Sequence, residues 1–441
     1  MKKEKKTLRQ TIAIGLCAIL LTGLAGCSSD GGSQESEPTK NCMIDYEFSS
    51  GTDQPLKSPS PANEPASTLP DADVVTVTDF GLRLLQNVPD TEDNVLLSPL
   101  SVINALTMTA NGANGETLSQ METTLGANVA SLSSYLHDYN TSLPEGEKYR
   151  FHLANSLWIK DMEAFVVEED FLRKNADLLN ADIFKAPFDV GTLRNINDWV
   201  SENTDQMIPS ILKEIPEDAV MYLINALAFD AEWQSIYREN QVRDAQFTKA
   251  DGTKQDIKMM YSDEHTYLSG DGVQGFLKYY ADGKYAFAAL LPDEGVDIKE
   301  FVDSLDGESL HDLLGKTTRA TVYAGIPKFQ TEYSIELNAL LRAMGMEKPF
   351  DDREADFSAL GHILDHTIYI SGVLHKTYIA VDEKGTKAGA VTAVEMQDNA
   401  AAILPDEIKT VYLDRPFVYM IIDCEESLPI FIGMVRSVEE P

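Results

Sequence analysis

The segment from residue 382 to residue 394 constrains this chain more than any other stretch of its sequence. Gly385 permits a sharp change of backbone direction that other residues resist. Beyond it, alternate residues of an extended chain would place only small side chains on one face: Thr386, Ala388, Ala390 and Thr392. Side chains of this size can enter a packed sheet without overpacking it. The segment can therefore lie as a loop or as a strand that is buried on one side.

The same segment resembles the hinge of the reactive loop in serpins, a family of metastable protease inhibitors. The matching residues are Glu383, Gly385, Thr386, Ala388, Ala390 and Thr392. Gly389 and Val391 stand where the family usually has alanine, which is a mild departure. The resemblance implies a reactive loop at about residues 383–408.

Other motifs resemble serpins in the order that the family has them. These motifs lie at residues 94–126, 222–233, 326–329, 355–358, 414–417 and 431–435. His375 also matches, between the fourth and the fifth of them. The resemblance covers residues 72–438. It implies an α+β domain with the serpin fold, in which helices pack on three β-sheets, one of them a large central sheet, and the reactive loop is exposed.

The amino terminus resembles an export signal and not a part of the fold. A basic start precedes an apolar stretch at residues 11–24, which is too short to span a membrane as a helix. The sequence Leu-Ala-Gly-Cys that follows resembles a bacterial lipoprotein box. This predicts a signal peptide at residues 1–26, lipid attachment to Cys27, and a lipid-anchored protein on the extracytoplasmic side of a cell membrane.

Residues 27–71 are rich in Ser, Gly, Pro and acidic residues, and they contain few apolar ones. Such a segment cannot bury enough apolar surface to order itself, so we expect a flexible tether before a serpin domain at residues 72–441. Cys42 lies in the tether and Cys424 in the domain. These two cysteines could pair, but nothing in the sequence requires it, and we expect no structural disulfide.

The composition is strongly acidic, with a formal net charge of −35. This charge opposes binding to nucleic acid and to anionic polysaccharide. Some serpins bind heparin through basic residues on an early helix, whereas here no Lys or Arg occurs between Arg83 and Lys148. We expect no nucleic-acid binding, no heparin binding and a monomeric protein.

Periodicity and turn residues predict the secondary structure of the domain. Ser98 can cap a helix that begins at Pro99 and ends near Gly112. Further helices are expected at residues 116–125, 132–139, 168–179 and 193–205. Strands are expected at residues 151–159, 221–229, 286–291, 321–328, 367–381, 417–422 and 430–435. Helices dominate the first part and strands the second, which favours an α+β fold.

The sequence predicts no catalytic centre, no metal site and no cofactor, so we do not expect an enzyme. No Gly-x-Ser-x-Gly elbow of an α/β-hydrolase occurs. His362 and His366 have a spacing found in zinc sites, but no Glu follows the first His as in His-Glu-x-x-His.

The resemblance implies that the chemistry belongs to a target protease. A serine protease, or a cysteine protease, would attack the loop and form an acyl-enzyme, and the hinge would then enter the central sheet as an added strand. The resemblance places four polar residues beneath that sheet, where their hydrogen bonds control strand separation: Ser98, Ser101, Asn225 and His375. It places Trp233 and Glu383 where insertion begins.

The family's usual spacing from Glu383 puts the cleaved bond between Asn399 and Ala400. A loop that is read one or two residues later would place the cut at Ala401 or Ala402. Small residues at this position would suit an elastase-like protease, and Asn399 would suit an asparagine-preferring one. The alternatives to inhibition are a serpin-fold decoy substrate or a lipoprotein that binds another molecule.

Overall fold

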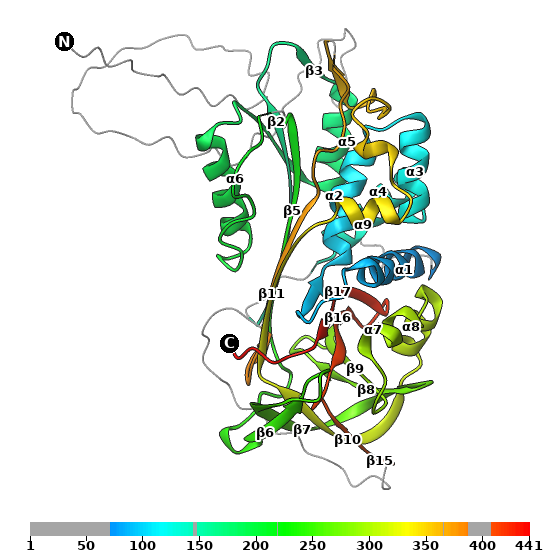
Figure 1. Ribbon diagram of the computed structural model, residues 1–441, viewed down its shortest axis with the longest axis vertical. Helices are drawn as coiled ribbons and strands as arrows, with labels where there is room; N and C mark the ends of the chain where they lie inside the picture. Colours follow the sequence, from blue (N-terminus) through cyan, green and yellow to red (C-terminus); the bar gives the residue numbers. More distant parts are fainter. Residues whose placement is uncertain (1–70, 144–147, 218, 365, 387–406) are drawn as a thin grey trace, which may run out of the picture.

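The computed structural model describes residues 71–143, 148–217, 219–364, 366–386 and 407–441, with side chains from residue 74 onward. In this part of the chain most helices pack on one side of a long sheet, while α6 covers the other side (Figure 1). The helices are α1 (Asp71–Asn87), α2 (Pro99–Ala110), α3 (Gly115–Leu125), α4 (Val129–Thr141), α5 (Glu169–Leu179), α6 (Val190–Asn203), α7 (Ile298–Asp303), α8 (Gly307–Gly315) and α9 (Asn338–Ala343), with short 3-10 helices at Glu239–Gln241 and Lys348–Phe350.

The strands of the described residues form three sheets, which together with the helices confirm the predicted α+β architecture of helices packed on three sheets. The central sheet has the order β11 (Phe329–Glu336), β13 (Leu374–Val381), β14 (Gly385–Thr386), β5 (Met221–Glu232), β2 (Tyr149–Lys160), β4 (Ala181–Ala186).

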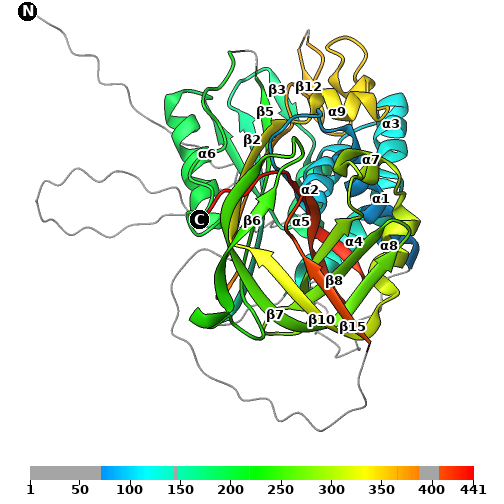
Figure 2. The same cartoon turned by 60° about the horizontal axis from the view of Figure 1, so that its bottom comes forward.

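The second sheet has the order β1 (Val95–Leu97), β17 (Leu428–Val435), β16 (Phe417–Asp423), β9 (Tyr285–Pro292), β8 (Val273–Tyr279), β7 (Lys254–Gly270), β10 (Thr318–Pro327), β15 (Ile408–Tyr412), and β6 (Val242–Thr248) pairs with β7. A small sheet joins β3 (Phe165–Val167) and β12 (Gly361–Ile363). Figure 1 shows β6, β7, β10 and β15 together at the bottom end of the molecule, and Figure 2 brings that end forward.

The cap of α2 forms as the sequence predicts. The Ser98 side chain accepts a hydrogen bond from the backbone N–H of Ser101 over 3.2 Å, and Pro99 occupies the first turn. The helix ends at Ala110, close to the predicted stop at Gly112. A Cβ at Gly112 would lie 2.5 Å from the Leu360 Cβ. The absence of a side chain at Gly112 therefore lets Leu360 pack closely against the end of α2.

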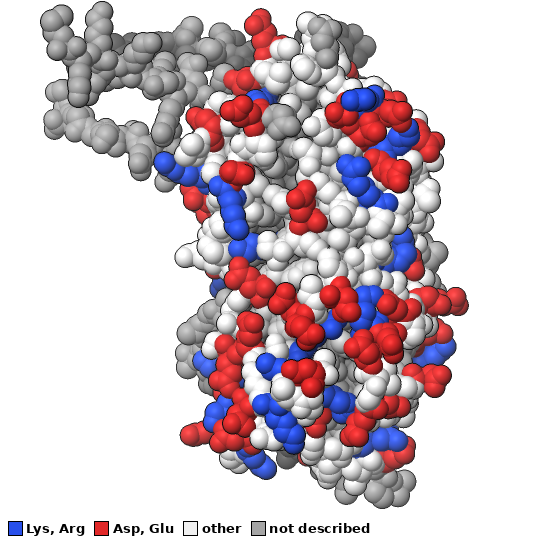
Figure 3. Space-filling model, viewed as in Figure 1, with Lys and Arg blue, Asp and Glu red and all other residues white. Residues whose placement is uncertain are grey.

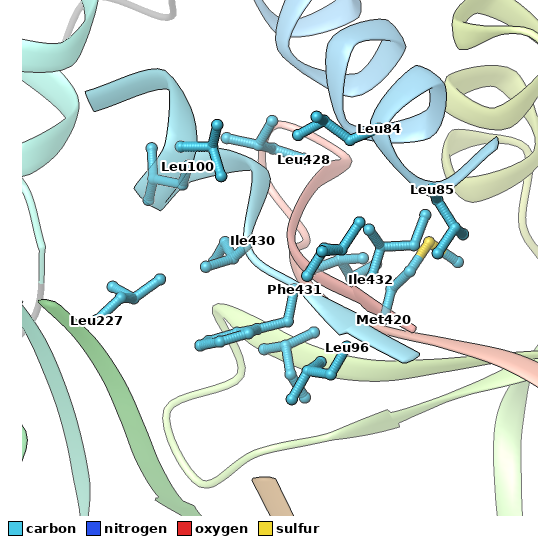
Figure 4. Close-up of a cluster of buried hydrophobic side chains, with 14 of the residues drawn as sticks. Leu84, Leu85, Leu96, Leu100, Leu227, Met420, Leu428, Ile430, Phe431 and Ile432 are labelled. Carbon is cyan, nitrogen blue, oxygen red and sulfur yellow. The ribbon is translucent and has the colours of Figure 1, made fainter. Parts of the chain in front are cut away.

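The main core lies where the two ends of the domain meet. Leu84 and Leu85 of α1 and Leu96 of β1 pack with the hairpin formed by β16 and β17 (Figure 4). Ile430 and Phe431 of that hairpin point toward Leu100, Leu227 and their neighbours on α2 and β5. A second, smaller core lies between α6 and the opposite face of the central sheet, around Trp158, Tyr222 and Ile224.

One strand prediction along the central sheet is wrong, and some of its strands were not predicted. The strand expected at residues 367–381 begins only at Leu374, because its antiparallel partner β11 ends at Glu336, directly opposite that residue. The preceding residues bond elsewhere, as when the Ile370 N–H donates to the Pro349 carbonyl. The strand β11 was not predicted, although its residues alternate between buried and exposed in the way typical of a strand.

Candidate functional site

The start of the predicted hinge already lies inside the central sheet. Gly385 and Thr386 form β14, between β13 and β5. Thr386 lies opposite Val381 on one side and Ala231 on the other, and only 1% of its surface is exposed. The sequence predicts an exposed reactive loop from about residue 383, and for Gly385 and Thr386 this is wrong. In the intact chain both residues are part of the central sheet.

Gly385 is required at its position by the closeness of the neighbouring strand. A Cβ at this residue would lie 2.0 Å from the carbonyl oxygen of Ala231, which is backbone and cannot move aside. The tight turn before it is held by Asp382, whose Oδ1 accepts from the N–H groups of Lys384 and Gly385. The docked hinge therefore depends on a residue without a side chain.

Trp233 and Glu383 anchor the same turn from both sides. The Trp233 indole N–H donates to the Asp382 carbonyl over 2.9 Å, and its backbone N–H donates to Lys384. Glu383 forms a 2.9 Å ion pair with Lys328. Burial alone would raise the pKa of Glu383, but Lys328, a backbone hydrogen bond and the charge of Lys384 together hold the pKa below its usual value. Both predicted residues thus lie where the hinge enters the sheet.

Three of the four polar residues predicted beneath the sheet lie together. His375 on β13 accepts a hydrogen bond through Nε2 from the backbone N–H of Ser98 over 3.0 Å. The Ser98 hydroxyl in turn receives the Ser101 N–H. Two residues further along β13, the Thr377 hydroxyl donates to the Leu96 carbonyl over 2.8 Å. These bonds tie β13 to the start of α2.

Asn225, the fourth residue, lies on the other side of the hinge on β5. Its Nδ2 donates to the Asn155 side chain on β2 over 2.7 Å, and Asn155 donates to the Leu179 carbonyl. The Asn225 Oδ1 is buried and has no hydrogen-bond partner among the described residues. His375 and Asn225, which were predicted to act together, therefore lie on β13 and β5, the two strands that β14 separates.

Burial lowers the pKa of His375 to about 4, from 6.5 for an ordinary His. The folded protein thus favours the neutral ring, and the unfolded chain binds one more proton between about pH 4 and 6.5. The free energy of unfolding is therefore highest above pH 6.5. It falls by about 3 kcal/mol as the pH drops to 4, because the unfolded chain takes up the proton first.

We therefore expect His375→Gln, which keeps an acceptor for the Ser98 N–H, to weaken the acid sensitivity of the fold. The measurement is the melting temperature of both proteins at pH 7 and pH 5. The variant should lose less on acidification than the original protein. Equal losses would mean that His375 already protonates in the folded state.

The side chains that support the hinge from the second sheet were not predicted from the sequence. Tyr280 contacts Thr386 directly, and Lys278 is only 2% exposed although Lys is rarely buried. Lys278 forms a 2.8 Å ion pair with Glu264. Burial opposes the charge, yet Tyr237 and Glu264 raise the pKa of Lys278 above its usual value. No local pattern marks these positions, because their partners lie far away in the sequence.

Several predicted residues lie outside the described part of the chain. They are Cys27 and Cys42, the hinge residues Ala388, Gly389, Ala390, Val391 and Thr392, and the candidate cleavage positions Asn399, Ala400, Ala401 and Ala402.

The visible charges are spread over the surface. Figure 3 shows acidic side chains over much of one face, with basic ones among them and no continuous basic area. Among the described residues, none of the helices has the length and apolar character needed to cross a membrane.

Comparisons with known proteins identify the family. The family described as "Serpin (serine protease inhibitor)" matches residues 75–438. An uncharacterized serpin-like protein of Thermococcus kodakarensis is 26% identical over 98% of this chain and 99% of its own. The leukocyte elastase inhibitor of Equus caballus is 27% identical over 82% of this chain and 98% of its own.

The solved structures agree with this match. The thermophilic serpin tengpin in its native state is 44% identical, with a TM-score of 0.79 over 84% of this chain and 96% of that one. Its latent state gives a TM-score of 0.75 at 42% identity, over 85% of this chain and 100% of that one. The family match spans most of the chain and the three-sheet architecture agrees with it, so this protein belongs to the serpin family.

Proposed function

We propose that this protein inhibits serine proteases by a single-use mechanism, in which the protease cleaves the reactive loop and is trapped as the loop enters the central sheet. Elastase-like proteases are the favoured targets. The observation that carries the proposal is β14, because Thr386 already occupies the place of an added strand between β13 and β5.

The register of β14 gives the small residues a defined place. It is antiparallel to both neighbours, so each further residue of an inserted strand would lie beside the preceding residue of β5 and of β13. Thr386 points toward the core, and directly opposite residues share a face. Continuing the pairing would put Ala388 between Phe229 and Ile379, Ala390 between Leu227 and Thr377, and Thr392 between Asn225 and His375.

This register explains why the inward positions carry small residues. Phe229 and Leu227 are buried on the core-facing side of β5, and a large neighbour there would overpack the space. At Thr392 the strand would instead meet Asn225, whose Oδ1 has no partner in the described residues. A hydroxyl at this point would supply the missing donor. The proposed insertion therefore fits both the size and the polarity of the surrounding strands.

Two of the compared proteins support the proposal. The relative from Equus caballus is named for inhibition of leukocyte elastase. Tengpin, the structural relative, occurs in a native and a latent state. The alanine residues at positions 400–402 of this chain agree with an enzyme whose pocket accepts small side chains.

Mixing the purified protein with an elastase-like serine protease should yield a covalent complex that survives boiling in detergent. The ester bond between the protease serine and the cleaved loop persists because insertion distorts the active site before hydrolysis. A protease inactivated at its serine serves as the control and should give no complex. Cleavage of the loop by fully active protease, with no complex for any enzyme in a panel, would instead support the decoy function.

The same reaction reports the cleaved bond. The cut creates a C-terminal fragment that stays packed through β16 and β17 and separates only on denaturation. Its mass should correspond to a start at Ala400, or at Ala401 or Ala402 if the loop is longer by one or two residues. A start at Ala400 means that the protease pocket holds Asn399, which needs polar partners, whereas the later starts need only a small apolar pocket.

We further propose that the chain is anchored to the extracytoplasmic face of a membrane through lipid on Cys27. The support is the Leu-Ala-Gly-Cys sequence after a basic and apolar leader. Replacing Cys27 by Ser should release the protein from the membrane fraction and abolish its labelling by a fatty-acid probe. A variant at Cys42 is the matched control and should remain anchored. Equal labelling of both variants would exclude this anchor.

A further inference from the structure

We propose that Tyr280 is a positioning residue for inhibition, which holds Thr386 in the central sheet before a protease arrives and so provides the starting point for insertion. This inference rests on the proposed function. It assigns a role to a residue that no sequence motif marks and that lies 106 positions from its partner.

The contact between the two side chains is short and fully enclosed. The Tyr280 hydroxyl lies 2.5 Å from the Thr386 hydroxyl, and neither residue is more than 1% exposed. The Tyr280 hydroxyl is kept un-ionised, because burial raises its pKa well above the usual value. The contact is therefore a hydrogen bond between neutral hydroxyls in a place that water does not reach.

The ring of Tyr280 has little freedom to move away from the hinge. It stacks on Trp233 with 4.6 Å between centroids and 14° between planes, and it meets Phe229 edge-on at 4.9 Å. Its backbone N–H donates to Tyr285 and its chain bridges to Trp233. The hydroxyl is thus held at a fixed point that Thr386 reaches only when it is docked.

A buried ion pair supports the partners of that ring. The Lys278 ammonium lies 5.4 Å from the centre of the Trp233 ring and 4.4 Å from that of Tyr237. Glu264 neutralises it, and the Tyr237 N–H donates to the Glu383 carbonyl. One corner of the second sheet therefore fixes the hinge on both sides of Gly385.

This arrangement gives the docked hinge a bond that the undocked hinge lacks. A buried hydroxyl without a partner is unfavourable, so removing one member of the pair should shift the hinge out of the sheet. Removing both hydroxyls leaves two apolar groups of nearly the same shape, which is close to neutral. A hydrogen bond between the two hydroxyls therefore predicts that the effects of the two single variants are not additive, whereas packing alone predicts additive effects.

The experiment compares four proteins with the original chain: Tyr280→Phe, Thr386→Val, the double variant, and Tyr279→Phe as a control. Tyr279 directly precedes Tyr280, and its hydroxyl pairs with Thr266 instead of a hinge residue. In the intact proteins, hydrogen exchange of peptides spanning residues 380–386 measures hinge docking without any protease. With an elastase-like protease, the number of inhibitor molecules consumed per trapped enzyme measures the efficiency of insertion.

We expect each hinge single variant to lower the docking equilibrium constant about tenfold, which corresponds to about 1.4 kcal/mol. Exchange should accelerate and several times more inhibitor should be consumed. The double variant should lose clearly less than the sum of the two single losses, and Tyr279→Phe should resemble the original protein. Additive losses in the double variant, or unchanged exchange in Tyr280→Phe, would overturn the role of this bond. If no protease is trapped even by the original chain, the proposed function fails, and the exchange data still decide whether Tyr280 docks the hinge.

Discussion

A variant in which Lys387 and Ala388 exchange places is expected to be cleaved by its target protease without trapping it. In the proposed inserted strand, continuing the register of β14 would put position 387 on the outward face and position 388 on the inward face, between Phe229 and Ile379. The exchange keeps composition and net charge, but it turns an ammonium group toward the core. Burying an unpaired charge costs several kcal/mol. A penalty of about 4 kcal/mol would slow insertion about a thousandfold.

Lys387→Ala alone is the matched control, because it removes the outward charge and leaves the inward face unchanged. It should still trap the protease. The two proteins are compared by the yield of covalent complex and by the amount of free cleaved inhibitor. Efficient trapping by the exchanged variant would show that position 388 does not enter the core, and would count against loop insertion as the step that inhibits.

Cleavage of the reactive loop between residues 395 and 404 should raise the melting temperature of this protein strongly. A nick in a surface loop normally leaves stability unchanged or lowers it. On the proposed mechanism, the freed segment would join β13 and β5 along the seam that β14 begins. Ten or more new backbone hydrogen bonds of about 1 kcal/mol each would add about 10 kcal/mol. At about 2 °C per kcal/mol, the expected rise is about 20 °C or more.

The measurement is thermal unfolding of the intact and the cleaved protein, followed by circular dichroism. The cleaved form of the exchanged variant is an internal control, since its loop should insert poorly and its melting temperature should rise less. A cleaved original protein that melts no higher than the intact one would contradict the idea that the intact fold is metastable.

The sequence predicted those parts of the fold that local chemistry determines. Ser98 and Pro99 define the start of α2 through groups that are adjacent in the chain. The α+β class and the hairpin of β16 and β17 also follow from local patterns. The start of β13 could not be predicted in this way, because the end of its partner β11 determines it and not its own residues.

In the candidate site, too, the features set by neighbouring residues could be predicted and those set by distant residues could not. The periodicity from Thr386 onward indicated which side chains could face a core, but it did not show that Thr386 is already buried. That depends on Tyr280 and on the carbonyl of Ala231, both distant in sequence. Lys278 gave no signal, because a buried Lys becomes acceptable only once Glu264 lies beside it.

The packing of β1 against β17 has a consequence for how this protein is made. The core around Leu96 includes Ile430 and Ile432, which lie among the final residues of the chain (Figure 4). During synthesis from the amino terminus, α1 and β1 emerge long before the hairpin that covers them. The core around Leu96 cannot close until β17 has left the ribosome, so α1 and β1 lack the hairpin that buries them for most of synthesis.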